Sequence, residues 1–387
     1  MQLTARQCVM QFAHVLQQEL FPHIDQALGP LSPQLELVAA VVSMLPLGRL
    51  LSATRAATGR PAKDRSALAT AFIAKAVLHL PTTRDLIQRL RVDEALRRLC
   101  GWRQAQQIPH ESKFSRAFAE FAAGQLPQQL HLAVVEATQG QRLVGHIARD
   151  STAIPAREGY SAPAQEQKRQ RKPRPRKHAP GAFARAQAAE RGTRIQRQRH
   201  QKLDRMLADL PRQCDIGAKT NSQGHEHYWR GYKLHWDIAD GQIPISAVLT
   251  SASVHDSQVA IPLMTMTSGR VVHLYELMDS AYDADAIHEH CRQLNHVPII
   301  APHPRRGTKK PSQLPKVFPV EPTPELSWAQ RERYQERTMV ERVNARLKDE
   351  FGASHLRVRG AAKVMAHLMF GVLALTVDQW LRLGKTG

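Results

Sequence analysis

The stretch Tyr334-Gln-Glu-Arg337-Thr-Met-Val-Glu341 lies in a segment that carries helix signals at both ends. Ser327 is followed three residues later by Gln330, which is the spacing of a capping box, and Gly352 stands where a helix would end. No proline or glycine interrupts the residues between Ser327 and Gly352. The pattern therefore predicts one continuous helix across this segment.

The predicted helix has two different sides. Each residue turns about 100°, so Tyr334, Arg337, Glu341 and Lys348 share one narrow face. A second face is apolar and can pack on a sheet; it contains Val340, Val343 and Leu347. The polar side places one carboxylate among cations and a phenol. For an arbitrary charged helix, such a side is most simply a solvated face with salt bridges.

The spacing on the polar side is more specific than a solvated face requires. The pattern resembles the signature around the last catalytic acid of bacterial insertion-sequence transposases, which carry an Asp-Asp-Glu triad. In this pattern Tyr is separated from Arg by two residues, Arg from Glu by three, and Glu from Lys by six. The resemblance implies that Glu341 is a catalytic metal ligand. It also implies two aspartates upstream, each at the end of an apolar strand. DNA contacts expected from the same helix are Tyr334, Arg337, Asn344 and Lys348.

Two aspartates occupy the expected places. Residues 142–148 form a short run rich in β-formers that leads to Asp150, and residues 271–278 form another that delivers Asp279. An aspartate directly after a strand often only caps a turn. Asp256 and Asp283 also precede predicted helices, and we interpret both as helix caps, which leaves Asp150, Asp279 and Glu341 as the catalytic metal ligands.

The remaining pattern of the second half predicts a mixed sheet. Residues 228–240 and 243–252 form two strands joined by Asp240-Gly241, a hairpin signal, and residues 297–301 form a last strand. Helices are expected at 258–266 and 284–294. This order fits a ribonuclease H-like α/β fold, which the resemblance also implies. A basic loop with Arg305 and Arg306 follows the last strand, where a phosphate backbone should pass.

The first half is predicted to be helical. We expect a helical segment at residues 1–58 and a helical domain at 59–138, before a catalytic domain at 139–387. The order Gly59-Arg60-Pro61, an apolar helix, and a turn into a second helix also resembles the transposases, in which this region is associated with recognising the element ends. A scaffold that only packs on the catalytic domain is the alternative. Lys113 and Arg116 are candidate phosphate contacts.

The composition indicates a polyanionic partner. The 387 residues contain 54 Lys+Arg against 34 Asp+Glu, for a net charge of +20 and a pI near 10.3. Much of this charge lies in a basic insert at about residues 160–215, for which we expect partial disorder and non-specific phosphate binding, or else only a solvated loop. The apolar segment 362–383 is interrupted by Asp378, which favours a core helix over a membrane span.

Two further features bear on the compartment. The N-terminus lacks the pattern of a signal peptide. The four cysteines are scattered without paired spacing, so neither a zinc finger nor a disulfide framework is indicated. We expect a cytoplasmic protein that acts in the bacterial nucleoid.

Three carboxylates brought together would repel one another unless a cation were present, so they suggest a divalent-metal site. Mg²⁺, or Mn²⁺, favours carboxylate and water oxygens and shares phosphate oxygens, and two ions are expected. The resemblance implies cleavage of double-stranded DNA at the element ends and attack of the freed 3′ hydroxyl on target DNA, carried out by a homodimer. The alternatives are a DNA-binding protein that has lost catalysis and a structure-specific nuclease without strand transfer.

Overall fold

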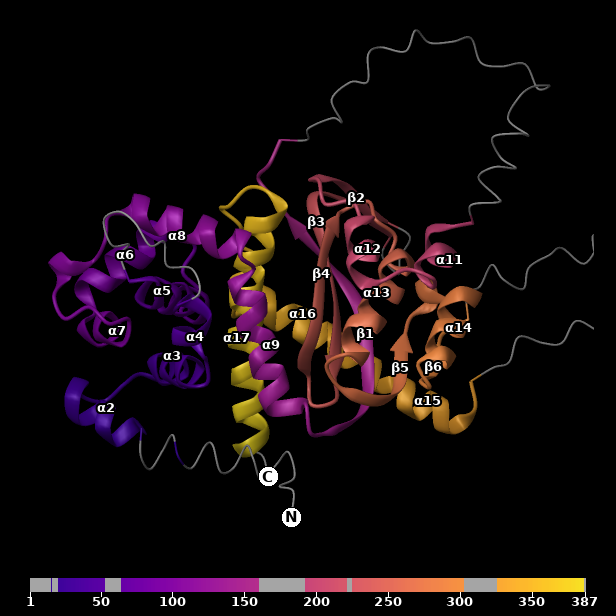
Figure 1. Ribbon diagram of the computed structural model, residues 1–387, viewed down its shortest axis with the longest axis horizontal. Coiled ribbons are helices and arrows are strands. Elements are labelled where there is room, and N and C mark those ends of the chain that lie inside the picture. The colour runs from indigo at the N-terminus through magenta and orange to yellow at the C-terminus, as the bar shows by residue number, and fades with distance from the viewer. Residues whose placement is uncertain are drawn as a thin grey trace, which may run out of the picture.

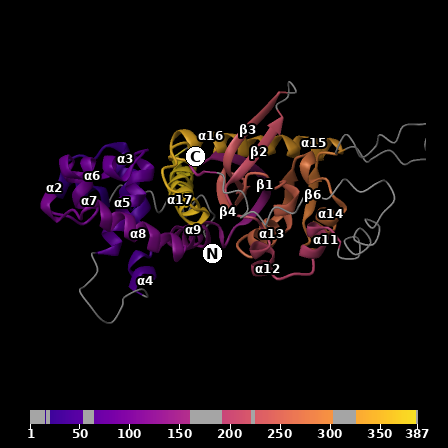
Figure 2. The ribbon, with the colours of Figure 1, turned by 90° about the horizontal axis from the view of Figure 1, so that it is seen from above.

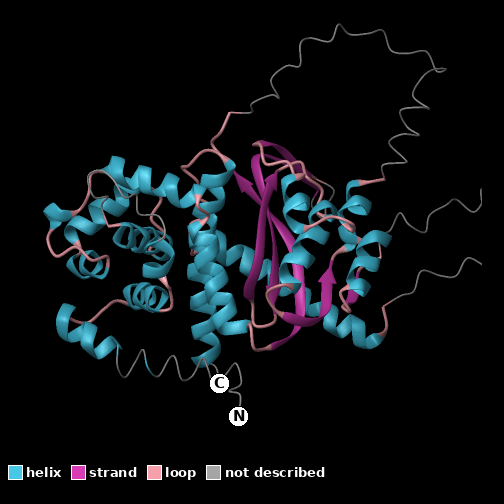
Figure 3. Ribbon diagram, viewed as in Figure 1, coloured by secondary structure: helices cyan, strands magenta, loops and turns pink. Residues whose placement is uncertain are grey.

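The computed structural model describes residue 15 and residues 20–52, 64–159, 192–220, 225–302 and 326–385. A helical first half is followed by a mixed sheet with helices on both faces (Figure 3). The helices of the first half are α2 (Phe21–Leu28), α3 (Pro33–Ser43), α4 (Leu47–Ser52), α5 (Arg65–Val77), α6 (Thr83–Val92), α7 (Glu94–Leu99), η2 (Ala105–Gln107), α8 (Glu111–Ala123) and α9 (Leu126–Gln139).

The second half begins with β1. Its elements are β1 (Leu143–Pro155), α11 (Arg194–Gln198), α12 (Leu203–Ala208), β2 (Asp215–Thr220), β3 (Glu226–Ala239), β4 (Ile243–Ser251), α13 (Ser257–Ser268), β5 (Val272–Met278), η3 (Ser280–Tyr282), α14 (Asp285–Gln293), β6 (Val297–Ile300), α15 (Trp328–Gln335), η6 (Glu336–Thr338), α16 (Met339–Asp349) and α17 (Ala361–Lys385). The predicted fold class, an α/β domain after an all-helical region, is confirmed.

The sheet has the strand order expected for a ribonuclease H-like fold. The path is β2-β3-β1-β5-β6, and β4 pairs with β3 beside β2. β1, β3 and β4 are antiparallel neighbours, whereas β5 and β6 run parallel to β1. The hairpin between β3 and β4 turns at Gly241, whose φ of 75° suits a glycine. The helices α15 and α16 lie over one face, and α12 and α13 lie over the other (Figure 2).

α17 joins the two halves through its packing. It lies between the first-half helices and the sheet (Figure 1) and contacts α3, α5, α8 and α9 on one side and β4 and α16 on the other. Its length and composition would allow a membrane span, but 67% of its apolar window is buried inside the protein. One hydrophobic cluster accordingly runs from the first-half helices through α17 to the sheet. These contacts support the predicted core helix.

The structure corrects the predicted helix between residues 327 and 352. The capping box of Ser327 and Gln330 is present, but α15 ends at Gln335 and a 3₁₀ turn, η6, precedes α16. The Thr338 hydroxyl donates to the carbonyl of Gln335 at 2.9 Å, and such local bonds compete with the α-helical ladder. The break lets the apolar face of α16 pack on the sheet while α15 stays outside the core.

Three other local predictions differ from the structure. The first strand continues through Asp150 to Pro155, because β3 pairs with it from Ile147 to Pro155. The single second helix expected after the apolar helix is two helices, α6 and α7, divided at Asp93, whose carboxylate accepts from the amide of Leu96 and caps α7. Strand β2 was not predicted; its six residues lie at the end of the expected basic insert.

Candidate active site

Asp150 and Asp279 are brought side by side by strand register. β1 and β5 are parallel, and Ala148 of β1 pairs with Leu277 of β5. Asp150 and Asp279 each lie two residues further along, so they lie at the same level, Asp150 within β1 and Asp279 just past the end of β5. Side chains two apart on a strand share a face, and Ala148 and Leu277 belong to the same hydrophobic cluster as Val343 of α16. Both carboxylates therefore lie on the face that α16 covers.

Asp150 is partly buried and has acidic neighbours. Burial, together with the neighbouring carboxylates of Asp279 and Asp256, raises the pKa of Asp150 to about 6. Asn344 of α16 donates its amide to Oδ2 of Asp150 at 3.4 Å. The Oδ1 atom of Asn344 accepts from Nε1 of Trp236 at 3.0 Å, and Trp236 is the residue of β3 that pairs directly with Asp150. Asn344 thus links α16 to the carboxylate and to the next strand.

Asp279 begins the short turn η3. Its Oδ1 accepts from the backbone amide of Ala281 at 2.9 Å, which fixes the carboxylate at the end of β5. Burial raises the pKa of Asp279, and the charge of Asp256 adds to the shift. Arg337 and Lys219 oppose it. A carboxylate held in this way is ready to accept a cation.

Glu341 reaches the site from α16 through Arg337. Nη2 of Arg337 lies 3.5 Å from Oε1 of Glu341, whose side chain is 63% exposed. Burial works against the charge of Arg337, but Tyr334, Asp150, Asp279 and Glu341 outweigh it and raise its pKa. The guanidinium is therefore within electrostatic reach of all three predicted ligands. The guanidinium of Arg337 thus supplies a positive charge that acts on all three carboxylates.

The charges of Asp150 and Asp279 act on each other and Glu341 is linked to them through Arg337, but the three carboxylates are not gathered to metal-ligand distance. Among the described residues, the group whose ligand atoms all lie within 4.8 Å is His273, Glu276 and His296, on the opposite side of β5. Glu341 is turned toward Arg337 and solvent.

Two family comparisons match the two halves of the chain. Residues 192–377 match the family described as Transposase DDE domain, and residues 24–120 match Transposase domain (DUF772). The chain belongs to the DDE transposases of insertion sequences. No curated protein and no solved structure matches it. Asp150 lies between the two matched ranges, so its assignment depends on the sheet register described above.

The transposase family carries several general properties to this chain. Its members are polynucleotidyl transferase-type enzymes that bind DNA and generally use divalent metal ions. The family suggests a soluble, DNA-acting protein, and the packing of α17 inside the fold agrees with that. The mixed sheet with flanking helices agrees with the ribonuclease H-like DDE domain of the family.

Lys219, which the sequence did not single out, lies close enough to the candidate site for its charge to act there. It lies near the end of β2, and its charge acts on Asp150, Asp279 and Lys348. Burial and Lys219 together lower the pKa of Lys348, whereas Asp150 raises it. The lysine stands at the tip of a polar hairpin with no recognisable motif. The pairing of β2 with β3 brings it within electrostatic reach of the carboxylates.

Asp256 differs from its predicted role. It occupies the N-cap position of α13 but makes no capping hydrogen bond; His255 accepts from the amide of Ser257 instead. The carboxylate turns inward to Nζ of Lys233 at 3.0 Å. Burial would raise its pKa, but His235 and Lys233 hold it below the usual range. Asp256 is therefore a charge-balanced neighbour of the aspartate pair.

Asp283 also differs from its predicted role. The N-cap position of α14 is occupied by Ala284, and Oδ1 of Asp283 lies 3.1 Å from Nε2 of His288. The capping aspartate is Asp279, which caps η3. Assigning the cap by sequence position failed because a short 3₁₀ turn separates β5 from α14.

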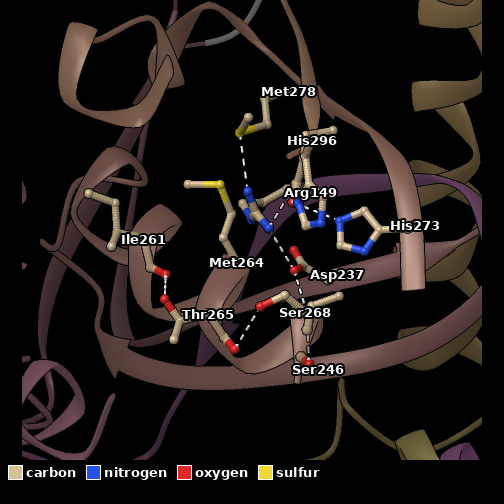
Figure 4. A network of polar contacts seen from close by, with 12 residues as sticks. Arg149, Asp237, Ser246, Ile261, Met264, Thr265, Ser268, His273, Met278 and His296 are labelled. Atoms are coloured by element: carbon tan, nitrogen blue, oxygen red, sulfur yellow. Dashed lines mark hydrogen bonds and ion pairs between the residues drawn. The ribbon is translucent and has the colours of Figure 1, made fainter. Parts of the chain in front are cut away.

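The opposite face of β1 contains a buried charge network (Figure 4). Nη2 of Arg149 lies 2.7 Å from Oδ2 of Asp237 and 3.0 Å from Oε2 of Glu276, and all three side chains have no exposed surface. His273 and His296 approach Oε1 of Glu276 at 2.9 and 3.3 Å. The network ties β1 to β3 and β5 next to Asp150. Its Arg149 already occupies one oxygen of Glu276, so a metal ion there would compete with an ion pair.

The other predicted DNA contacts lie apart from the carboxylates or outside the described residues. Lys113 and Arg116 are exposed on α8 in the first-half helices. Arg305 and Arg306 fall outside the described residues, as does the basic stretch 160–191. Tyr334 stacks beside Arg337, whose guanidinium carbon is 5.7 Å from the ring centre. The structure therefore groups Tyr334, Arg337, Asn344 and Lys348 with the acids.

Proposed function

We propose that this transposase cuts DNA at the ends of its element and joins the freed 3′ hydroxyl to target DNA. The observation that carries the proposal is the shared register of Asp150 and Asp279, with Arg337 within electrostatic reach of both and of Glu341. Neither a structural helix nor a simple DNA-binding surface requires three carboxylates around one guanidinium. That arrangement favours a catalyst over the inactive DNA-binding alternative.

Asp150, Asp279 and Glu341 would hold Mg²⁺ or Mn²⁺. The donor set fits, because carboxylate oxygens are the ligands that these ions prefer and because Asp150 and Asp279 lie at the same level of neighbouring strands. When bound, the ions would polarise the phosphodiester and activate the attacking oxygen. Glu341 would have to leave Arg337 to join the aspartates.

The cations around the acids would position the DNA. Released from Glu341, Arg337 can hold two oxygens of one phosphate with its planar fork. Lys348 and Lys219 add point charges within electrostatic reach of Asp150. Asn344 would keep Asp150 in place through Trp236, and Tyr334 would stack on the strand end.

We further propose that the helical first half recognises the element ends and that two copies act together on paired ends. Lys113 and Arg116 project from α8, outside the catalytic sheet, where they can contact DNA beyond the cut. Arg305 and Arg306 would contact the strand near the acids.

Cleavage of a supercoiled plasmid carrying the element ends tests the catalytic assignment. The ends can be read as inverted repeats in the DNA that flanks the gene. We expect Asp150→Asn, Asp279→Asn and Glu341→Gln each to abolish metal-dependent cutting while DNA binding persists. Asp240→Asn is the matched control, because Asp240 is an ion-paired aspartate of the same domain outside the site.

Near wild-type cutting by any one of the three variants would remove that residue from the ligand set. A strand-transfer assay with pre-cut ends then separates the transposase from a nuclease. We expect joined product that depends on the 3′ hydroxyl. Cutting without any joined product would favour the nuclease alternative.

A further inference from the structure

A cavity lies between the first-half helices and the segment that joins α16 to α17. Its volume is about 290 Å³. Lys75 of α5 lies in its wall, and Gly352, just past the end of α16, lines it as well. The other residues used below that line it are Phe72, Thr82, Thr83, Phe118, Arg357, Arg359, Lys363, His367 and Phe370. Nothing in the proposed catalytic site uses this cavity.

Lys75 presents a buried charge without a counter-ion. Its side chain is only 9% exposed, in the middle of the apolar helix α5. Among the described residues, no hydrogen bond or ion pair reaches its ammonium group. Burial lowers the pKa of Lys75 to about 8, although Asp85 acts to raise it. Asp85 itself is engaged in the capping box with Thr82, at 2.7 Å from its hydroxyl.

The rest of the cavity adds positive charge and no acid. Arg357, Arg359 and Lys363 are exposed at its mouth, and no aspartate or glutamate is among the described residues that line it. Thr82 and Thr83 bring the N-terminus of α6 to the wall, and helix N-termini favour anions. The floor is aromatic, and Phe72 and Phe370 stack with ring centres 5.9 Å apart.

An anion in the cavity would meet strong attraction. The aromatic floor excludes water and lowers the local dielectric, so each cation acts more strongly there than at the surface. Arginines at the mouth match phosphate oxygens in geometry, and Lys75 supplies a point charge at the base. Unpaired buried charge is costly, and a bound phosphate would balance it.

We propose that this cavity holds a phosphate group of bound DNA. The proposal rests on the proposed function, since DNA is the phosphate-bearing substrate. Gly352 lies only four residues beyond Lys348, so a strand anchored here runs close to the helix that carries the catalytic signature. The cavity would then fix one DNA phosphate between the first-half helices and the catalytic domain.

DNA binding without metal tests the proposal. Anisotropy of a labelled element-end duplex, measured in EDTA over a series of salt concentrations, gives affinity and salt slope for Lys75→Met. We expect weaker binding and a log–log slope flatter by roughly 0.9, which corresponds to one lost phosphate contact. An unrelated duplex should show the same loss, because phosphate contacts carry no sequence information. Arg91→Met, which removes an exposed cation from α6, is the control and should leave the slope unchanged.

Folding is monitored separately. Lys75→Met replaces a buried charge with an apolar chain, so its melting temperature without DNA should equal or exceed that of the wild type. Should it fall, Arg357→Gln/Arg359→Gln at the exposed mouth provides the same test without touching the core, and it too should flatten the slope. An unchanged slope in a folded Lys75→Met variant, or in the double variant, overturns the proposal.

Inorganic phosphate distinguishes a DNA site from a site for a free anion. If phosphate raises the melting temperature of the wild type but not of Lys75→Met while the DNA slope is unchanged, the cavity takes a small anion and the DNA assignment is wrong. If the wild type binds no DNA at all, the proposed function itself fails. If the wild type binds DNA and Lys75→Met binds with the same slope, only the cavity proposal fails.

Discussion

Replacing Arg149 with methionine should remove much of the protein's free energy of unfolding. The change leaves the carboxylates of Asp237 and Glu276 buried without the guanidinium that lies 2.7 and 3.0 Å from them. Removing one partner of a buried ion pair costs about 3–5 kcal/mol, because the remaining charge is uncompensated. We expect an Arg149→Met loss in the free energy of unfolding of that size, measured by urea denaturation followed through tryptophan fluorescence.

Arg142→Met provides the matched control. Arg142 directly precedes β1 and pairs with Asp240 at 2.5 Å, but both side chains are about one quarter exposed. Partly exposed pairs contribute about 0–1 kcal/mol, so this variant should lose far less. A loss from Arg149→Met no larger than that from Arg142→Met would refute the reasoning.

The pH dependence of the Arg149→Met loss provides a second check. Burial acts to raise the pKa of Glu276, but Arg149 and the two histidines outweigh it and hold the pKa low. Without Arg149 the pKa should rise above that of the unfolded chain, so the folded variant takes up a proton as the pH falls. The deficit against wild type should therefore be smaller at pH 5 than at pH 8. The triple variant Arg149→Met/Asp237→Asn/Glu276→Gln should recover part of the loss at pH 8.

Three other predictions concern separate parts of the molecule. Gly371→Ala should destabilise the protein by about 1–3 kcal/mol, because its Cβ would lie 2.6 Å from the carbonyl oxygen of Phe351; Gly269→Ala, with no atom nearer than 3.6 Å, is the control in the same urea assay. Arg337→Ala should strongly lower the rate of single-turnover cleavage with little change in melting temperature, and Arg337→Lys should restore only part of that rate. A normal cleavage rate in Arg337→Ala would show that the signature spacing is accidental. Burial lowers the pKa of Lys75 to about 8, so the folded protein releases this proton at a lower pH than the unfolded chain does. The free energy of unfolding of the wild type should therefore rise relative to that of Lys75→Met as the pH rises from about 8 to about 10.4. If the free energies of unfolding of the two proteins change with pH in the same way, the burial of the Lys75 charge is contradicted.

The parts of the fold governed by local signals could be predicted from the sequence. The capping box at Ser327 formed because its spacing satisfies two backbone amides reciprocally. The turn at Gly241 formed because a glycine is available where φ is positive. Asp279 was placed at the end of a strand because a short apolar run directly precedes it. In each case the decisive residues lie within a few positions of one another.

The features that depend on distant partners could not be predicted. Lys219 acts on the acids only because β2 pairs with β3, and β2 has no apolar alternation from which the strand could be predicted. Arg149 is buried because Asp237 and Glu276 arrive from two other strands. Lys75 stands out in an apolar helix, but the sequence does not show that its neighbours from α17 leave it unpaired. The first-half helices were predicted, whereas the cavity they form with α17 was not.

The pairing of Pro155 with Gly231 has a practical consequence for engineering. It closes β1 five residues past Asp150, before the chain departs into the connection between residues 159 and 192. The position of Asp150 is therefore set by strand pairing outside that connection, and lengthening a connection costs only about 0.6 kcal/mol for each doubling. A foreign sequence-specific DNA-binding domain inserted there should change which DNA sequence the enzyme binds, while its cleavage rate on pre-bound ends stays that of the parent.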